Sequence, residues 1–296
     1  MRIALTGSTG LIGSAVARRL DHHEVVRVGR RDSADIRVDL TDANAMAVLD
    51  LGDIDALVHC AGVVDEDFRD DPDKAMQTAV FGSDALVQAA LRGGADRLAY
   101  ISSAHIYGPM VGRVDESCEP NPSSNYAIAH YATEQVFRRY AKNGVAAAAL
   151  RPCAVFGELP DIASFRRWSL IPFSFPRDAI INHQIVLEST GEQRRNFVGS
   201  DDIADSCAAW LDSRPAGWTA FNPVGAMDSS VYEFAQLCAD LAQELSGERC
   251  GITRRAADGP TFGDDFSYVS LAPGALGTQS ARETVKRLMV ALQQER

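Results

Sequence analysis

The sequence has no long apolar run, no closely paired cysteines and no excess of positive charge. No apolar stretch among its 296 residues approaches the length of a bilayer-spanning helix, so we expect no membrane insertion. The first residues already read as a core strand, without the basic flank, apolar segment and cleavage site of a signal peptide. We therefore expect a cytoplasmic protein.

Six cysteines occur without a CxxC motif or another short paired spacing. This pattern is expected of reduced structural thiols, and it indicates neither a disulfide framework nor a zinc site. We predict no bound metal. The formal net charge of −11 and the pI near 5.0 repel polyanions, which argues against nucleic acid as the main partner.

The remaining composition is that of an ordinary soluble protein. Hydrophobic residues make up 46% and charged residues 23% of a 31.9 kDa chain, which is long enough to bury a sizeable core. The length allows two domains or one large α/β unit.

The first thirteen residues organise the rest of the chain. Residues 2–6 read as a short buried strand, and Gly7, Gly10 and Gly13 follow in the spacing GxxGxxG before a helix at about 14–20. In such a turn the glycines permit a tight bend, a close approach of a pyrophosphate and tight packing of helix on strand. The free N–H groups of the helix then face the phosphates. The alternative is an ordinary strand-to-helix turn, but the flanking strand and helix favour dinucleotide binding.

Strands and helices alternate along the first half of the chain. We expect further strands at 24–29, 34–38, 56–62, 98–102 and 145–150, and helices at about 41–51, 73–91 and 124–140. Because βαβ units give parallel strands, this alternation predicts an α/β fold with a Rossmann-type, doubly wound parallel sheet.

The alternation breaks after Arg151. Residues 158–195 are rich in Pro, Phe and Ile, and we do not expect the segment from Pro172 to Pro176 to form a regular helix. Helices at about 201–211, 229–245 and 280–293 and a strand at 219–223 follow. We predict a dinucleotide-binding domain of residues 1–157 plus about 196–225, and a smaller C-terminal substrate-binding lobe of about 158–195 and 226–296.

Six motifs follow one another along nearly the whole chain. They are TGSTGLIG at 6–13, HCAG at 59–62, YISSAHIYG at 100–108, Tyr126 opening a helix, LRP at 150–152, and QRRNFV at 193–198 before Asp201 and Asp202. Together they resemble the extended short-chain dehydrogenase/reductase family, in its branch of NAD(P)-dependent nucleotide-sugar epimerases and dehydratases. The resemblance implies cofactor contacts from Gly7, Gly10, Leu11, Ile12, Gly13, Cys60, Ala61, Gly62, Tyr126, His130 and Pro152.

The residues after the second strand favour NADP over NAD, although NAD stays possible. NAD-preferring members of the family end this strand with an acid that binds both ribose hydroxyls, and here the position holds Gly29. Arg30 and Arg31 follow, and a guanidinium suits a 2′-phosphate. The alternative is two solvated arginines at a strand end. By resemblance, Asp39 and Leu40 would flank the adenine.

The resemblance also implies the chemistry. The family moves a hydride between the nicotinamide and a carbinol carbon while a tyrosine exchanges the hydroxyl proton, and Tyr126 matches that tyrosine. A phenol with a reference pKa near 10 is a poor base, and the family lowers this pKa with a lysine one helical turn later. Position 130 holds His instead. A protonated His130, with a reference pKa of about 6.5, predicts turnover favoured at mildly acidic pH.

Further positions in the sequence bear on the reaction. Ala79 and Ala154 stand where the family usually has asparagines of the proton relay and of the diphosphate site. Ser103 is retained where the family has a Ser or Thr that bonds the reacting oxygen, with backbone capping as its alternative role. Dehydratases of this branch carry an Asp-Glu pair next, and Ala104-His105 stands there. This argues against dehydration and leaves His105 as a substrate-side acid or base, or as a structural residue.

The substrate end and the assembly follow by the same resemblance. Arg195 matches the family arginine that clamps the substrate diphosphate, and Arg194 beside it could equally do this. The alternative is an ion pair with Asp201 or Asp202. Family members commonly form homodimers through the helices that here span about 73–91 and 124–140, so we expect a homodimer.

The leading interpretation is an NAD(P)-dependent oxidoreductase or epimerase of a nucleotide-activated sugar, with Tyr126 as acid/base, Ser103 orienting the oxygen and His130 in the place of the lysine. Two alternatives stay open. Ala79 and His130 favour an NADP-binding sensor or scaffold with little or no catalysis. Ala154 favours a reductase of a non-nucleotide carbonyl compound.

Overall fold

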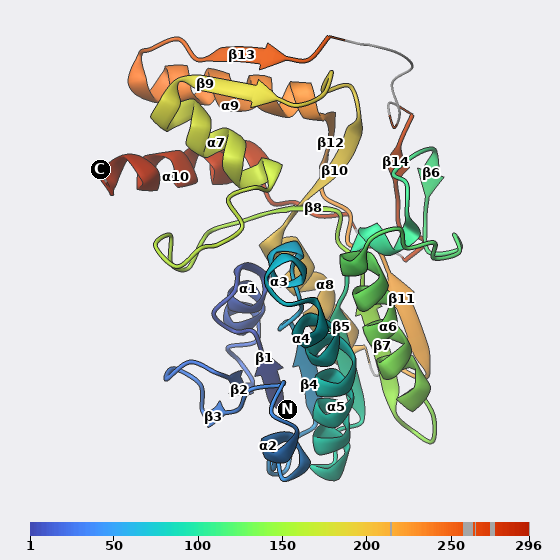
Figure 1. Ribbon diagram of the computed structural model, residues 1–296. Coiled ribbons are helices and arrows are strands. Elements are labelled where there is room, and N and C mark those ends of the chain that lie inside the picture. The colour runs from blue at the N-terminus through green and yellow to red at the C-terminus, as the bar shows by residue number, and fades with distance from the viewer. Residues whose placement is uncertain (214, 257–262, 264, 273–275, 296) are drawn as a thin grey trace. The chain divides into compact units, whose positions relative to one another are not determined.

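A seven-stranded parallel sheet has the order β11-β7-β5-β4-β1-β2-β3, and all of its strands except β11 come from the first 150 residues (Figure 1). Every pair of neighbouring strands in it is parallel, which confirms the predicted α/β Rossmann-type fold. The strands are β1 (Arg2–Thr6), β2 (Glu24–Gly29), β3 (Ile36–Arg37), β4 (Ala56–His59), β5 (Arg97–Ile101), β7 (Ala146–Leu150) and β11 (Trp218–Phe221).

The computed structural model describes residues 1–213, 215–256, 263, 265–272 and 276–295. The chain forms two units. The first comprises Met1–Gly108, Glu116–Pro152 and Ile203–Asn222, and the second comprises Pro109–Asp115, Cys153–Asp202 and Pro223–Arg296.

Helices of the first unit pack beside one another in pairs. Arg19 of α1 forms an ion pair with Asp205 of α8, and Arg139 and Tyr140 of α6 both bind Asp84 of α5. The helical segments of this unit are α1 (Leu11–Arg19), α2 (Ala43–Ala47), α3 (Asp65–Asp70), α4 (Pro72–Met76), the π-helix η1 (Gln77–Gly82), α5 (Ser83–Arg92), the 3₁₀ turn η2 (Ala104–Tyr107), α6 (Asn125–Tyr140) and most of α8 (Ser200–Asp212).

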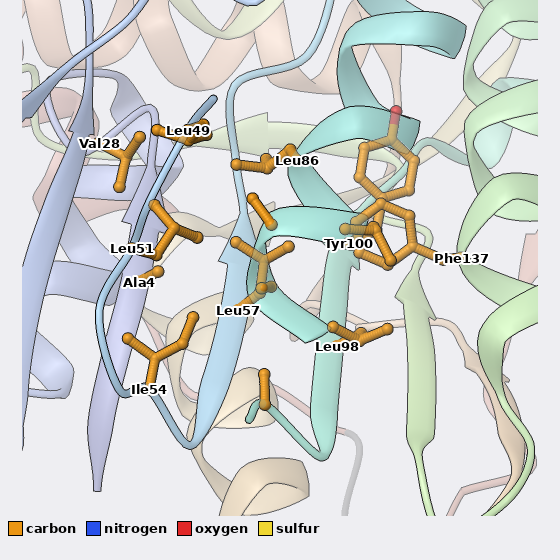
Figure 2. Close-up of a cluster of buried hydrophobic side chains, with 14 of the residues drawn as sticks. Ala4, Val28, Leu49, Leu51, Ile54, Leu57, Leu86, Leu98, Tyr100 and Phe137 are labelled. Atoms are coloured by element: carbon orange, nitrogen blue, oxygen red, sulfur yellow. The ribbon is translucent and has the colours of Figure 1, made fainter. Parts of the chain in front are cut away.

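The core of the first unit lies between the sheet and α5 and α6. Leu57 of β4, Leu86 of α5 and Leu98 of β5 are fully buried in it, because parallel strands covered by helices are apolar on both faces (Figure 2). Tyr100 and Phe137 close one end of this cluster, and Figure 2 shows the Tyr100 hydroxyl at its edge.

The predicted helix over 73–91 is interrupted. It runs as α4, η1 and α5, and the π-helical turn adds a residue to the hydrogen-bonded ring. The predicted helix over 41–51 is shorter, since α2 ends at Ala47, although Asp42 caps it as capping preferences indicate.

The second unit holds three small sheets and three helices among its described residues. α7 (Ile171–Asn182) packs against α9 (Val231–Ser246) and α10 (Ala281–Gln294). Its sheets are β12-β10-β8, β13-β9 and β14-β6, with the strands β6 (Arg113–Val114), β8 (Ala154–Phe156), β9 (Gln184–Leu187), β10 (Arg194–Gly199), β12 (Met227–Ser230), β13 (Gly251–Arg254) and β14 (Ser267–Tyr268).

The expectation that Pro172 to Pro176 is not helical is wrong, because both prolines lie within α7. Pro172 is in the first turn, where a backbone N–H has no intrahelical partner to lose. Pro176 removes one hydrogen bond further along, but Phe173, Phe175 and Ile180 bury the same helix in the core. Burial of this apolar face outweighs one missing bond.

No helix in the described part of the chain is both long and apolar enough to cross a bilayer.

Candidate functional site

The sheet order places a ligand crevice at the carboxyl ends of β1 and β4. The chain proceeds from β1 to β2 and β3 on one side of the sheet, and from β4 to β5, β7 and β11 on the other. Open α/β sheets bind ligands where the strand order reverses in this way. The residues that follow these strand ends therefore define the candidate site.

The glycine turn after β1 tolerates no side chain at two of its positions. Gly7 has φ +68°, and a Cβ there would lie 2.7 Å from the backbone nitrogen of Ala61. A Cβ on Gly13 would lie 2.0 Å from the carbonyl oxygen of Gly7. Helix α1 begins next, and its N-cap residue, Gly10, provides no side-chain cap. Its first N–H groups, which include those of Leu11 and Ile12, suit an anion such as a pyrophosphate.

A buried histidine lies under this turn. The Nδ1 atom of His59 is 2.7 Å from Thr6 Oγ1, and its Nε2 atom is 3.0 Å from Ser83 Oγ. Thr6 Oγ1 also accepts a hydrogen bond of 3.2 Å from the N–H of Ala61. A neutral imidazole with its proton on Nε2 satisfies all three bonds. Burial lowers the pKa of His59 to about 4, so the ring is neutral at pH 7.

The residues predicted to bind the adenosine end lie near the ends of β2 and β3. A Cβ on Gly29 would meet no atom within 4 Å, and Arg30 and Arg31 are exposed. Burial opposes ionisation of Asp39, but hydrogen bonds from Thr41 and the charge of Arg30 hold its pKa below the usual value. An open position followed by two exposed guanidiniums fits a 2′-phosphate.

Leu40 and the residues after β4 also lie in the first unit. A Cβ on Gly82 would lie 2.5 Å from the carbonyl oxygen of Leu40, so η1 approaches Leu40 closely. Cys60, Ala61 and Gly62 follow β4 directly. A Cβ on Gly62 would lie 3.3 Å from Cε1 of His130, which places the imidazole beside this segment.

Tyr126, His130 and His105 gather at the start of α6. Ser124 caps this helix by accepting a bond from the N–H of Ala127, so Tyr126 lies in its first turn. The Tyr126 and His130 rings lie 4.4 Å apart between centroids, as the i, i+4 spacing predicts. The exposed His105 ring meets the Tyr126 ring edge to face at 5.8 Å.

Ser103 lies two residues before His105 in the sequence and is buried. Its Oγ accepts a 3.2 Å bond from the N–H of His105, so it caps η2. A hydroxyl that accepts this bond keeps its own proton for another acceptor. Pro152 is buried too, and its carbonyl oxygen accepts a 2.9 Å bond from Ala104.

Ala79 lies in the π-helical turn η1, whose wider hydrogen-bonded ring changes the direction of its carbonyl groups. The Thr133 hydroxyl of α6 bonds the Ala79 carbonyl oxygen at 2.7 Å and the Ala129 carbonyl oxygen at 2.9 Å. The turn is therefore held without the asparagine side chain that the family resemblance leads one to expect.

Sequence reasoning missed two buried polar groups of this unit. Tyr100 Oη lies 2.7 Å from His130 Nδ1, and the only sign of this group in the sequence was a tyrosine two positions before the two serines. Arg151 holds both carboxylate oxygens of Glu134, at 3.0 and 2.7 Å, and donates to the Tyr107 hydroxyl at 2.8 Å. The motif at 150–152 marked Arg151, but nothing in the sequence indicated its partner.

Arg195 belongs to the second unit. It lies on β10, and its Nη1 donates to the carbonyl oxygen of Arg194 at 2.6 Å. Arg194 itself pairs with Asp228 at 2.6 Å. Asp202, the alternative partner considered for Arg195, accepts bonds from the backbone N–H groups of Gly199, Thr278 and Gln279.

A group of possible metal ligands lies before β2, at the opposite end of this strand from Gly29. Atoms of His22, His23 and Asp212 lie within 4.8 Å of one another. This group is therefore not part of the candidate site.

The sequence model of the NAD dependent epimerase/dehydratase family matches residues 3–222.

The chain is also similar to curated proteins. It is 26% identical over 183 residues to the uncharacterized protein y4nG of Sinorhizobium fredii, which covers 60% of this chain and 43% of that protein. It is 28% identical over 272 residues to the bovine methionine adenosyltransferase 2 subunit beta, which covers 88% of this chain and 77% of that protein. The chain thus spans less than half of the first relative and about three quarters of the second.

Solved structures share the fold over the full chain. MoeE5 in complex with UDP-glucose and NAD aligns with TM-score 0.79 at 22% identity, covering 100% of this chain and 99% of that one. RMD from Pseudomonas aeruginosa complexed with NADPH aligns with TM-score 0.80 at 21% identity, covering 100% and 98%. Both bind a nicotinamide dinucleotide, one of each type.

Proposed function

The chain belongs to the NAD dependent epimerase/dehydratase family, and from this membership we propose that it is an NAD(P)-dependent oxidoreductase or epimerase acting on a nucleotide-activated sugar. The reaction is hydride transfer at a carbinol or keto carbon of the sugar. A bound nicotinamide ring supplies or accepts the hydride. The protein binds and orients both molecules and moves the hydroxyl proton.

The gathering of Tyr126, His130 and His105, with the His130 ring beside Gly62, carries this proposal. The half-buried Tyr126 is the acid/base for the sugar hydroxyl, and the adjacent His130 replaces the lysine of the family. Ser103 orients the reacting oxygen through its hydroxyl proton, since its oxygen already accepts a bond from the backbone. His105, whose ring meets the Tyr126 ring edge to face, binds the substrate.

The cofactor is NADP in preference to NAD. Gly29 leaves the space of an acidic side chain empty, and Arg30 and Arg31 lie next to it in the sequence. A carboxylate at this position would repel the 2′-phosphate, whereas guanidiniums attract it. Leu11, Ile12, Cys60, Ala61 and Pro152 complete the cofactor contacts by family correspondence.

The substrate and the assembly belong to the same proposal. Arg195 binds the diphosphate of the substrate, and residues of about 158–195 and 226–296 form the substrate-binding lobe. The chain forms a homodimer through η1, α5 and α6. The side chains of Phe81 and Ile128 on these elements are 74% and 44% exposed, which supports an apolar partner surface there.

A panel assay tests the function. The purified protein is incubated with NADP(H) or NAD(H) and a series of nucleotide sugars, and sugar products are separated and identified. We expect product with at least one nucleotide sugar, and loss of product in Tyr126→Phe with cofactor binding retained. Product formed equally by Tyr126→Phe would contradict the assigned role. Absence of turnover with every sugar would contradict the enzymatic function.

A second candidate function is that of a nucleotide-binding subunit of another enzyme, with little catalysis of its own. The similarity to a protein named as a subunit of a methionine adenosyltransferase favours it, as do His130 and Ala79. This candidate predicts that the cofactor binds but that no sugar and no simple carbonyl compound is turned over. The same panel, extended by simple carbonyl compounds, therefore separates the two functions.

A further inference from the structure

Tyr100 is a buried phenol that bonds the candidate acid/base machinery directly. It lies in the middle of β5, between Leu98 and the serines at 102 and 103, and only 1% of it is exposed. A buried phenol needs a polar partner, because an unpaired hydroxyl in an apolar interior is costly. Its Oη finds this partner in His130 Nδ1, at 2.7 Å.

The Tyr100 ring is fixed on several sides. It stacks on the rings of His59 at 5.5 Å, Phe137 at 5.4 Å and His130 at 5.8 Å between centroids. Burial raises the pKa of the Tyr100 hydroxyl well above its usual value, with smaller contributions from Tyr126 and Glu134, although a hydrogen bond with the Thr133 side chain opposes the shift. The group therefore stays a neutral phenol, able both to donate and to accept one hydrogen bond.

The contact decides which nitrogen of His130 faces Tyr100. A ring turned by half a rotation would place Cδ2 against the Tyr100 hydroxyl and remove the bond between the hydroxyl and the imidazole, so that the hydroxyl would keep only its side-chain bond with Thr133. In the orientation that the structure shows, Cε1 and Nε2 of the His130 ring lie toward Gly62. A Cβ added to Gly62 would be 3.3 Å from Cε1 and 3.8 Å from Nε2. Gly62 ends the segment assigned to the cofactor.

We propose that Tyr100 is a positioning residue that keeps a proton on His130 Nε2, so that the imidazole always presents an N–H where the family has a lysine ammonium. The hydroxyl donates to Nδ1 of the neutral ring and accepts from Nδ1–H of the cation. Nε2 carries a proton in both states. This inference rests on the proposed function, because it assigns His130 to the place of the lysine.

The tautomer of His130 tests the inference without any turnover. The protein is labelled with ¹⁵N at its histidine rings, and long-range proton–nitrogen correlations are recorded for the wild type, Tyr100→Phe and Tyr107→Phe. His130→Asn identifies the signals of His130 among the six histidines. Tyr107 is the matched control, since it is another buried tyrosine, with 6% of it exposed, and its hydroxyl binds Arg151 and Asn222.

We expect neutral wild-type His130 to be protonated at Nε2 with Nδ1 as acceptor, and Tyr100→Phe to give a mixture of the two tautomers. Tyr107→Phe should keep the wild-type tautomer. An unchanged tautomer in Tyr100→Phe would overturn the inference and leave the proposed function untouched. An Nδ1-protonated neutral ring in the wild type would overturn it as well.

Kinetics give the second readout once a substrate is known. We expect Tyr100→Phe to lower kcat about tenfold, the effect of one well-placed hydrogen bond, with little change in the KM of the sugar. In a His130→Lys background the same substitution should cost less than about twofold, because Tyr100 acts through the imidazole. An equal loss in both backgrounds would contradict the inference, and absence of turnover would contradict only the function.

Discussion

The buried His59 makes the stability of the first unit depend on pH. Burial lowers its pKa from 6.5 to about 4, so the unfolded chain binds a proton that the folded protein does not over this range. The contribution of the neutral His59 to the free energy of unfolding is therefore fully present above pH 6.5 and is lost as the pH falls toward 4. Relative to about pH 7.5, the loss is about 2 kcal/mol near pH 5 and about 3 kcal/mol near pH 4.

The contacts of His59 explain why the folded protein rejects this proton. A cation would need acceptors at both nitrogens, but Thr6 Oγ1 already accepts a bond from the N–H of Ala61 while it donates to Nδ1. Protonation would therefore turn the Thr6 hydroxyl away from its arrangement under the glycine turn. Since this turn begins the proposed cofactor site, acid should weaken cofactor binding as well as stability.

Urea unfolding at several pH values between about 7.5 and 4.5 measures the effect. His59→Gln removes the titrating group, and we expect it to be less stable at neutral pH but to lose about 2 kcal/mol less than the wild type on going to about pH 5. His105→Gln, at an exposed position, should retain the wild-type dependence. If His59→Gln and the wild type lose stability in parallel, His59 is not the group responsible.

Three further substitutions test other parts of the molecule. Gly29→Asp should weaken NADPH binding at least about tenfold and strengthen NADH binding. The open position admits a carboxylate, which would repel the 2′-phosphate. An unchanged ratio of the two dissociation constants would refute the assignment of Arg30 and Arg31 to the 2′-phosphate. His130→Lys should raise turnover and flatten the rise that we expect toward mildly acidic pH, which initial rates across pH measure; a lower rate would show that charge is not what the imidazole lacks. Glu134→Ala should cost about 3–5 kcal/mol in chemical denaturation, because it leaves the buried Arg151 guanidinium unpaired; a loss below about 1 kcal/mol would mean that water reaches Arg151.

Much of the first unit could be predicted from the sequence because its signals are local. The strand, glycine turn and helix at 2–19 and the second strand at 24–29 follow from apolar runs and glycine spacing within a few residues. The Tyr126 and His130 contact likewise follows from helical periodicity. These features need no knowledge of distant contacts.

The remaining features depend on partners far apart in the chain. Tyr100 and His130 are 30 positions apart, and Thr6 and His59 are 53 positions apart, so neither pair has a local signature. The π-helical turn at Ala79 depends on Thr133 of another helix. The helix through Pro176 depends on the apolar surface that covers it.

Calorimetric titration of the purified protein with NADPH and with NADH tests the central claim most directly. The claim is that a dinucleotide binds across the turn formed by Gly7, Gly10 and Gly13, beside Tyr126 and His130. We predict a saturable heat at one cofactor per chain, with tighter binding of NADPH. No heat with either nucleotide would contradict the proposed site and the chemistry assigned to it.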